Sequence, residues 1–322
     1  MPLTTDIQIK PFRPQDLVQV LQLMNLALGV AVNSQPRSEA YWRWKHLHNP
    51  FGKSIMLLAW RDDELVGFRA LLRWRLKSQG KTINAVRAVD TVTHPDYQGQ
   101  GIFSRLTLAA LEECKRQDVC LVWNTPNQNS RAAYLKLGWR SQGKINMVIK
   151  PLHPLGMLVG IWGHCFGQVR SDSPAPSHTL QPNDVRDLHR PTSDGLQSEI
   201  GERYYQWRYC EVPHLQYFFY RDGDWAFIYR MNTRLGMREC VLSEILSTQP
   251  RDDTAGCSAA LRGLTRTLSA DYLVLAKQVQ ERCLAAGVWI GLGKMELIAN
   301  WLIDAEPTTS SFSFSTGDLE VF

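Results

Sequence analysis

A turn containing two glycines carries the strongest chemical signal in the sequence. It reads Gln98-Gly99-Gln100-Gly101-Ile102-Phe103-Ser104 and joins an apolar, β-branched run at 83–93 to a segment with helical spacing. Glycines let successive backbone N–H groups turn toward a ligand, and a helix N-terminus adds N–H donors and a partial positive charge. The combination predicts a cradle for an anion such as a pyrophosphate. The missing Gly-Lys-Ser/Thr excludes a P-loop, and the missing third glycine excludes the dinucleotide-binding fingerprint.

A second pattern follows the apolar strand signal at 120–125. It reads Asn127-Gln128-Asn129-Ser130-Arg131-Ala132-Ala133-Tyr134-Leu135-Lys136-Leu137-Gly138-Trp139, a short helix that we expect to end at Gly138. When an amine attacks a thioester, a thiolate leaves, and the phenol of Tyr134 can protonate it as a general acid. The alternative for Tyr134 is an ordinary helix tyrosine packed in a core.

Both patterns resemble those of the GNAT acetyltransferases. The cofactor motif of that family, Q/R-x-x-G-x-G/A, is matched from Gln98 to Ile102, and Phe103 stands where the family has a small residue. The second signature, Y-x-K-L-G-F/W, is matched by residues 134–139. The resemblance covers roughly residues 6–150. It implies an acyltransferase that moves the acetyl group of acetyl-CoA, its co-substrate, to a primary amine without a metal.

The resemblance also implies which residues contact the cofactor. These are Thr91, Val92, Thr93, Gln98, Gly99, Gln100, Gly101, Ile102, Phe103, Ser104, Asn127 and Asn129. The turn would bind the pyrophosphate, the two asparagines would lie near the pantetheine arm, and Tyr134 would point at the acetyl sulfur. The strand at 85–93 would splay from its neighbour, so that the backbone of residues 91–93 faces the pantetheine amides and polarises the acetyl carbonyl. The alternative is a plain ladder strand.

A general base is useful because the amine must attack in its neutral form. Asp90 is the strongest candidate, because it is a carboxylate inside an otherwise apolar strand. The alternative is a structural carboxylate that pairs with Arg87 or caps a turn. His94 and Glu39 are weaker candidates, and a chain of water molecules can also serve.

The elements around these motifs predict a mixed α/β domain. Residues 1–150 read as strand, helix, hairpin, strand, glycine turn, helix, strand and helix. A similar pattern restarts after the Pro/Ser-rich residues 171–177, where Pro182 and its neighbours correspond to Pro14 and its neighbours. We therefore expect an α/β fold (α+β, mixed sheet) of two tandem GNAT-like domains, the second degenerate. The expected parts are 1–150, a linker with an apolar segment at 151–178, and 179–322.

The second half lacks the chemistry of the first. In place of the glycine cradle it has Asp252, Asp253 and Gly256, and carboxylates repel a pyrophosphate. The counterpart of Tyr134 is Cys283. We expect this half to have a structural or substrate-shaping role and to bind no CoA.

Two further kinds of segment have alternative readings. The aromatic stretches at 41–44 and 204–207 have helical spacing, which favours core positions over an acceptor groove. Residues 155–169 are apolar but too short to span a bilayer, so we expect a packed or interfacial segment between domains rather than membrane contact.

Composition and charge set wider limits. A net charge of +5 suits an anionic ligand such as CoA and is too small to argue for nucleic acid. The 7 cysteines are scattered without metal-binding spacing, so we expect reduced thiols in a cytoplasmic protein. The N-terminus has no signal-peptide pattern.

The sequence leaves the acceptor, the oligomeric state and the activity open to alternatives. Tandem relatives such as mycothiol synthase favour a small-molecule amine as acceptor, and a homodimer stays open. One alternative function is a Fem-like aminoacyl transferase, a family that uses charged tRNA and lacks the CoA cradle. The other is a non-catalytic CoA-binding scaffold.

Overall fold

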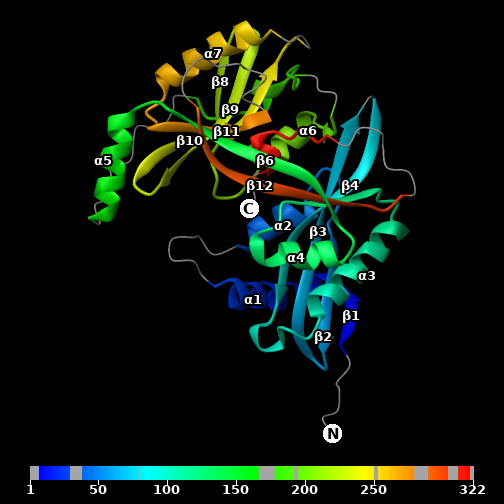
Figure 1. Cartoon of the computed structure of the whole chain (residues 1–322). Coiled ribbons are helices and arrows are strands. Elements are labelled where there is room, and N and C mark those ends of the chain that lie inside the picture. Colours follow the sequence, from blue (N-terminus) through cyan, green and yellow to red (C-terminus); the bar gives the residue numbers. More distant parts are fainter. Residues whose placement is uncertain are drawn as a thin grey trace. The chain divides into compact units, whose positions relative to one another are not determined.

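The computed structural model describes residues 7–29, 38–78, 80–166, 178–191, 195–249, 253–278, 289–303 and 311–319. The chain forms two units, each with hydrogen-bonded strands and helices packed on them (Figure 1). Unit 1 comprises Met1–Gln142 and Leu297–Thr308, and unit 2 comprises Gly143–Glu296 and Thr309–Phe322. Both units contain antiparallel and parallel strand pairs, which confirms the predicted α/β class with mixed sheets.

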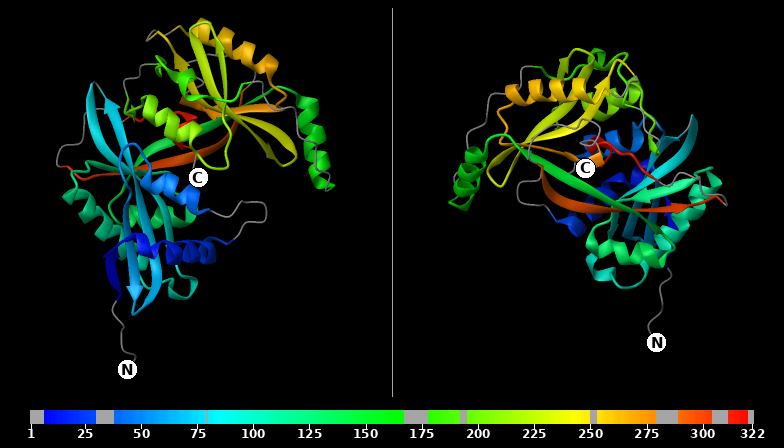
Figure 2. Two further views of the ribbon diagram at one scale, coloured as in Figure 1. Left: turned by 180° about the vertical axis from the view of Figure 1, so that it is seen from behind. Right: turned by 45° about the horizontal axis from the view of Figure 1, so that its top comes forward.

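The sheet of unit 1 is built around two long strands joined by a hairpin, β3 and β4 (Figure 2). In order across the sheet, the strands are β1 (Gln8–Pro11), β2 (Ile55–Arg61), β3 (Glu64–Ser78), β4 (Lys81–Thr93), β5 (Leu121–Asn124) and the last residues of β12 (Ile290–Trp301). Neighbouring strands are antiparallel except β4 and β5, which are parallel. The parallel pair therefore lies between the two antiparallel parts of the sheet.

Helices cover both faces of this sheet. They are η1 (Pro14–Asp16), α1 (Leu17–Leu28), α2 (Glu39–Leu47), η2 (Pro95–Tyr97), α3 (Ile102–Arg116) and α4 (Gln128–Lys136). Val20 of α1 and Trp42 of α2 pack with Phe68 on one face. Leu106 of α3 and Tyr134 of α4 pack on the other face. The helix that follows the glycine turn and the helix that carries the tyrosine thus share one side of the sheet.

Gly67 on β3 lets α3 approach the sheet closely. A Cβ atom at Gly67 would lie 2.7 Å from Cγ2 of Ile102 and 3.0 Å from Cδ1 of Leu106. Real Cβ atoms do not come that close, because close-packed interiors leave no room for the overlap. The glycine therefore sets the distance between the sheet and the first turn of α3.

Unit 2 contains a second set of strands and its own helices. Its strands, in order across the sheet, are β6 (Arg140–Pro151), β11 (Tyr272–Ala276), β10 (Met237–Ser247), β9 (Trp225–Arg234) and β8 (Phe218–Asp222). The remaining elements are α5 (Pro154–Cys165), η3 (Pro182–Val185), β7 (Gln197–Ser198), α6 (Glu202–Tyr205), a short π-helix η4 (Gln206–Cys210), α7 (Thr254–Thr267) and α9 (Thr316–Leu319). Helix α7 packs on β8 and β9.

The two units share one order of elements. In unit 1, the antiparallel strands β2, β3 and β4 are followed by α3 and by β5 parallel to β4. In unit 2, the antiparallel strands β8, β9 and β10 are followed by α7 and by β11 parallel to β10. This correspondence agrees with the internal repeat in the sequence.

Two strands lie in a different unit from the one that a linear division predicts. Strand β6, which ends the first half of the sequence, pairs with β11 in unit 2. The end of β12, from the second half, pairs with β5 in unit 1. The units therefore differ from the expected linear parts 1–150 and 179–322, because the apolar pattern identifies a strand but not its partner.

The apolar segment at 155–169 is described as far as residue 166 and forms α5. Its Gly156, Met157 and Gly160 contact other elements of unit 2, to which α5 belongs, and Gly160 lies against the backbone of Gly236. The opposite face exposes Leu155, Leu158, Val159, Ile161, Trp162 and Phe166. Within the described part of the chain, the helix therefore packs on one face. No helix among the described residues is long and apolar enough to cross a membrane.

Two other expectations concern the aromatic stretches and the cysteines. The aromatic stretches are core residues, as expected, because Trp42, Trp44, Tyr204, Tyr205 and Trp207 are buried. The expectation that all cysteines are reduced is wrong, because Cys257 on α7 is in a disulfide. Scattered cysteines give no spacing from which such a bond can be recognised, since pairing depends on distance in the fold.

Candidate active site

The parallel strands β4 and β5 pair along only part of β4, in agreement with the separation that the family resemblance implies. Their pairing runs only from Ala85 with Leu121 to Arg87 with Trp123, although β4 continues to Thr93. A bulge accompanies the separation, because β4 has two residues between Ala88 and Thr91 where β3 has one. The result is an open edge on β4 between Ala88 and Thr93, which we call the open edge.

The backbone alternation of β4 decides which residues face the open edge. The N–H of His94 donates to the carbonyl of Val66 at 2.9 Å, so Val92 exchanges hydrogen bonds with its partner Phe68. The N–H and C=O groups of Thr91 and Thr93 then point away from β3, toward the open edge. Of the three predicted backbone contacts, Thr91 and Thr93 are placed to meet a ligand, whereas the backbone groups of Val92 are used in the β3–β4 ladder.

The glycine turn has the backbone conformation of an anion cradle. Gly99 and Gly101 have φ angles of 77° and 75°, a region that side-chain-bearing residues rarely adopt. The space where their Cβ atoms would stand is open. The first hydrogen bond of α3 runs from the N–H of Arg105 to the carbonyl of Gly101 at 3.0 Å, which leaves the N–H groups of residues 102–104 at the helix N-terminus for a ligand. These residues fit a pyrophosphate.

The side chains of the turn have separate positions. Gln98 and Gln100 are exposed, whereas Ile102 is buried under the sheet. Phe103, which replaces the family's small residue, packs edge-on against Tyr134 with ring centroids 5.2 Å apart. The substitution therefore adds a contact between α3 and α4 and leaves the helix intact.

Tyr134 is buried and touches a cation that sequence analysis did not single out. Its hydroxyl oxygen accepts a hydrogen bond from Nη2 of Arg69 at 3.3 Å, and its ring packs against Trp139. Nη1 of Arg69 donates to Oγ1 of Thr91, also at 3.3 Å. The signal available in the sequence was an arginine inside an apolar run, the same feature that singled out Asp90.

The two predicted asparagines lie at the start of α4. Asn127 is the N-cap of the helix, and its Oδ1 accepts a hydrogen bond from the N–H of Ser130 at 2.9 Å. Asn129 lies in the first turn, and its side chain is outside the described residues. Asn127 thus has a structural role that fixes the start of α4, and its contact with pantetheine stays a prediction.

Asp90 lies in a buried network of ion pairs and hydrogen bonds. Its Oδ2 is 2.8 Å from Nζ of Lys45 and 2.9 Å from Nε2 of His46, both on α2. Nδ1 of His46 is 2.9 Å from Oγ of Ser54. The structural role left open by the sequence is therefore present, and Lys45 and His46 on α2 are partners that the sequence did not indicate. The role of general base stays a prediction.

The weaker base candidates are differently placed. His94 is 3.8 Å from the carboxylate of Glu64, which also accepts a hydrogen bond from the hydroxyl of Tyr97 at 2.6 Å. Glu39 forms an exposed pair with Arg43 on α2. Burial raises the pKa of the Cys114 thiol in unit 1 to about 12, so this thiol is neutral and not a nucleophile.

Replacing Asp90 by asparagine is expected to lower the free energy of unfolding by about 3–5 kcal/mol, because the buried charge of Lys45 loses its carboxylate counter-ion. The matched control is Glu39→Gln. It removes one carboxylate from an exposed ion pair on α2, the helix that also carries Lys45, and costs about 0.5 kcal/mol or less. Urea unfolding measures both. Equal losses of unfolding free energy in the two variants would contradict a buried ion pair between Asp90 and Lys45.

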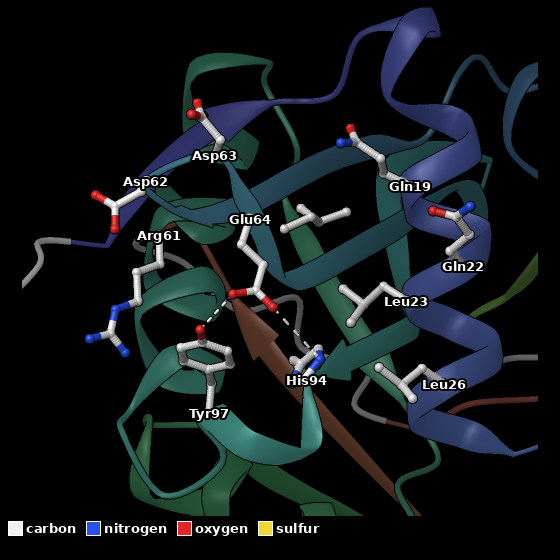
Figure 3. Close-up of a pocket in the computed structure, with 11 residues that line it drawn as sticks. Gln19, Gln22, Leu23, Leu26, Arg61, Asp62, Asp63, Glu64, His94 and Tyr97 are labelled. Atoms are coloured by element: carbon white, nitrogen blue, oxygen red, sulfur yellow. Dashed lines mark hydrogen bonds and ion pairs between the residues drawn. The ribbon is translucent and has the colours of Figure 1, made fainter.

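A pocket of about 590 Å³ lies beside η2, directly before the glycine turn (Figure 3). Glu64 points into it toward Tyr97 and His94, whereas Asp62 and Asp63 point away. Gln19, Gln22, Leu23 and Leu26 of α1 form the opposite wall. The pocket therefore offers a carboxylate, amides and an apolar wall next to the cradle.

In the corresponding turn of unit 2, the carboxylate of Asp253 occupies a backbone N–H group at the start of the helix. Oδ1 of Asp253 accepts a hydrogen bond from the N–H of Gly256 at 2.9 Å and caps α7. That N–H is a donor that an anion would need. Asp252 and Cys283 were also predicted to distinguish the second half from the first, and both lie outside the described residues.

The comparisons with known proteins agree with this geometry. Residues 8–141 match the family of acetyltransferase (GNAT) domains. A search of curated protein sequences gives no match. Among solved structures, the chain is similar to a GCN5-related N-acetyltransferase from Anabaena variabilis, with 11% identity and a TM-score of 0.66 over 92% of this chain and 73% of that one.

Two further solved structures have the same fold. A probable N-acyltransferase from Enterococcus faecalis has 12% identity and a TM-score of 0.64 over 92% of this chain and 72% of that one. Saccharomyces cerevisiae N-myristoyltransferase with bound myristoyl-CoA has 11% identity and a TM-score of 0.56 over 96% of this chain and 82% of that one. Identities this low show the fold alone. The match to the acetyltransferase (GNAT) domain model covers residues 8–141, the part of this chain that holds the glycine turn and Tyr134.

Proposed function

We propose that this protein is an N-acetyltransferase that transfers the acetyl group of acetyl-CoA to a primary amine of a small molecule. One observation carries the proposal: the open edge of β4 has the glycine cradle at its end and the phenol of Tyr134 beside it, connected through Arg69 and Thr91. An anion site and a proton donor on one strand edge suit a long thioester with a phosphorylated end.

The cofactor would lie along β4. The N–H groups at the start of α3 would hold the pyrophosphate, and the backbone of Thr91 and Thr93 would bind the pantetheine amides. Gln98, Gln100 and Ser104 would line the cradle. The structure of N-myristoyltransferase, which shares this fold, contains a CoA thioester, and this supports a CoA derivative here.

The reaction would be a direct transfer. The nitrogen of the neutral amine attacks the acetyl carbon, the C–S bond breaks, and its electron pair goes to sulfur. Tyr134 gives its proton to the sulfur, and the amine gives one proton to a base. Asp90 is our candidate for that base, and His46 and Ser54 would carry the proton onward through their hydrogen bonds.

Unit 2 would be a degenerate copy of the same domain that binds no CoA. The shared order of elements supports the copy, and the carboxylate of Asp253 on the N–H of Gly256 supports the loss of the anion site. We propose a structural or substrate-shaping role. The localisation that fits this proposal is the cytoplasm, where acetyl-CoA is available.

Calorimetric titration with acetyl-CoA is expected to give one site per chain. Ligand at about 100 times its dissociation constant should also add about 2.7 kcal/mol of stability in thermal unfolding. Tight binding of two equivalents would contradict a silent unit 2. A screen of small amines, read by release of the CoA thiol, then tests the transfer and finds the acceptor.

Two other functions give different results in these assays. A non-catalytic CoA-binding scaffold would bind acetyl-CoA and release no thiol with any amine. A Fem-like aminoacyl transferase would bind charged tRNA, its substrate, and would bind no acetyl-CoA. Absence of acetyl-CoA binding would remove the proposed function.

A further inference from the structure

The guanidinium of Arg69 is buried without an anionic partner among the described residues. The residue is 1% exposed, and its hydrogen bonds go to the neutral oxygens of Thr91 and Tyr134. Its Nε has no hydrogen-bond partner. A buried charge is costly unless an opposite charge accompanies it. A negative charge that comes with a ligand or forms during the reaction would therefore be stabilised next to Arg69.

The residues around Arg69 indicate where that negative charge would lie. Its guanidinium lies over the rings of Phe103 and Tyr134, each at 5.4 Å from the ring centroid. The nearby Cys114 supplies no charge, since burial raises the pKa of its thiol to about 12. Tyr134 and Thr91 are thus the groups through which an anion at the open edge would reach the guanidinium.

The direction of the hydrogen bond to Tyr134 matters for the chemistry. A guanidinium can only donate, so the phenol oxygen is the acceptor and its own hydrogen is free to point elsewhere. A hydrogen directed away from Arg69 can reach a sulfur at the open edge. Arg69 therefore fixes the phenol in the orientation that a proton donor needs.

We infer that Arg69 is the counter-ion of the negative charge that forms when the thioester C–S bond breaks. The inference rests on the proposed function and deepens it. The electron pair of the C–S bond goes to sulfur, and the phenol proton moves to the sulfur, which leaves the charge on the oxygen of Tyr134. Sulfur and oxygen share one proton, and Arg69 stabilises the remaining charge on either atom. Arg69 is a positioning residue that acts through Tyr134.

Binding of free CoA tests this without knowledge of the acceptor. The CoA thiol and Tyr134 together carry two protons before binding and share one in the complex, so binding releases up to one proton below the pKa of the free thiol. Calorimetry in buffers of different ionisation enthalpy counts that proton. Desulfo-CoA, which lacks the sulfur, is expected to release none. The affinity for CoA relative to desulfo-CoA should rise by up to about tenfold per pH unit.

Variants of Arg69 separate charge from packing. Arg69→Met should bind desulfo-CoA as the wild type does and release no proton with CoA, whereas Arg69→Lys should keep much of the release. The matched control is Arg75→Met, which removes an exposed arginine from the same strand and should keep all of it. If Arg69→Met no longer binds desulfo-CoA, the test rests on Arg69→Lys. Loss of the proton release in Arg69→Lys would then overturn the counter-ion role.

The outcomes for the wild type are also distinct. If neither CoA nor desulfo-CoA binds, the proposed function fails. If both bind and CoA releases no more protons than desulfo-CoA does, the function stands and the inference about Arg69 is wrong. An equal rise of both affinities with pH would also overturn it, because that rise would not involve the sulfur.

Discussion

Replacing Gly101 by glutamate is expected to lower the affinity for acetyl-CoA by roughly a thousandfold. A carboxylate about 4 Å from a phosphate costs about 4 kcal/mol at an effective dielectric constant of about 20, and about 1.4 kcal/mol corresponds to a factor of 10. The positive φ of Gly101 adds a strain of about 1–2 kcal/mol to any side chain there. Calorimetric titration of the variant measures the loss.

Two controls separate the charge from the strain. Gly101→Gln brings the same backbone strain and a similar volume without the charge, so it should bind more tightly than the glutamate variant. Gly80→Glu places the same charge at a similar positive φ with open space around it, in the β3–β4 turn. It should leave the affinity unchanged. Equal affinities of wild type and Gly101→Glu would mean that the turn does not bind the cofactor.

Removing the hydroxyl of Tyr134 is expected to slow acetyl transfer about 10²–10⁴-fold, the range of general acid catalysis. Tyr134→Phe keeps the ring that packs against Phe103 and Trp139, so the fold should persist. Acetyl-CoA should bind with nearly the same affinity, because the cradle and the open edge are unchanged. Thiol release with the acceptor from the amine screen measures the rate.

The same substitution elsewhere in unit 1 provides the comparison. Tyr41 lies on α2 and packs against Trp44, so Tyr41→Phe removes a hydroxyl outside the open edge and should keep the full rate. Retained turnover in Tyr134→Phe would refute the general acid role and with it the role of Arg69 in proton transfer. A loss of acetyl-CoA binding in Tyr134→Phe would assign the hydroxyl to cofactor binding instead.

Local sequence patterns were enough to predict the elements of the candidate site. The turn from Gln98 to Ser104 lies between a strand and a helix as expected, because glycine spacing and apolar periodicity are local properties of the chain. The helix with Tyr134 was predicted for the same reason. The separation of β4 from β5 came from the family resemblance, since no local pattern encodes where two strands stop pairing.

Side-chain partners could not be predicted in the same way. Asp90 stood out as a carboxylate in an apolar strand, but its partners Lys45 and His46 lie on α2, far away in sequence. Arg69 and Tyr134 are 65 residues apart. Contacts of this kind depend on which faces of the sheet the helices cover, and periodicity gives a face without giving its neighbour.

The sequence by itself determined the class of fold and the glycine turn between a strand and a helix, and it predicts an anion cradle and the residue types of the chemistry there, because each depends on residues close together in the chain. The tertiary structure alone decided that β6 pairs in unit 2 and the end of β12 in unit 1, and that Arg69 reaches the phenol of Tyr134. These features depend on pairing and packing between distant segments, which the whole set of competing contacts selects and no local pattern contains.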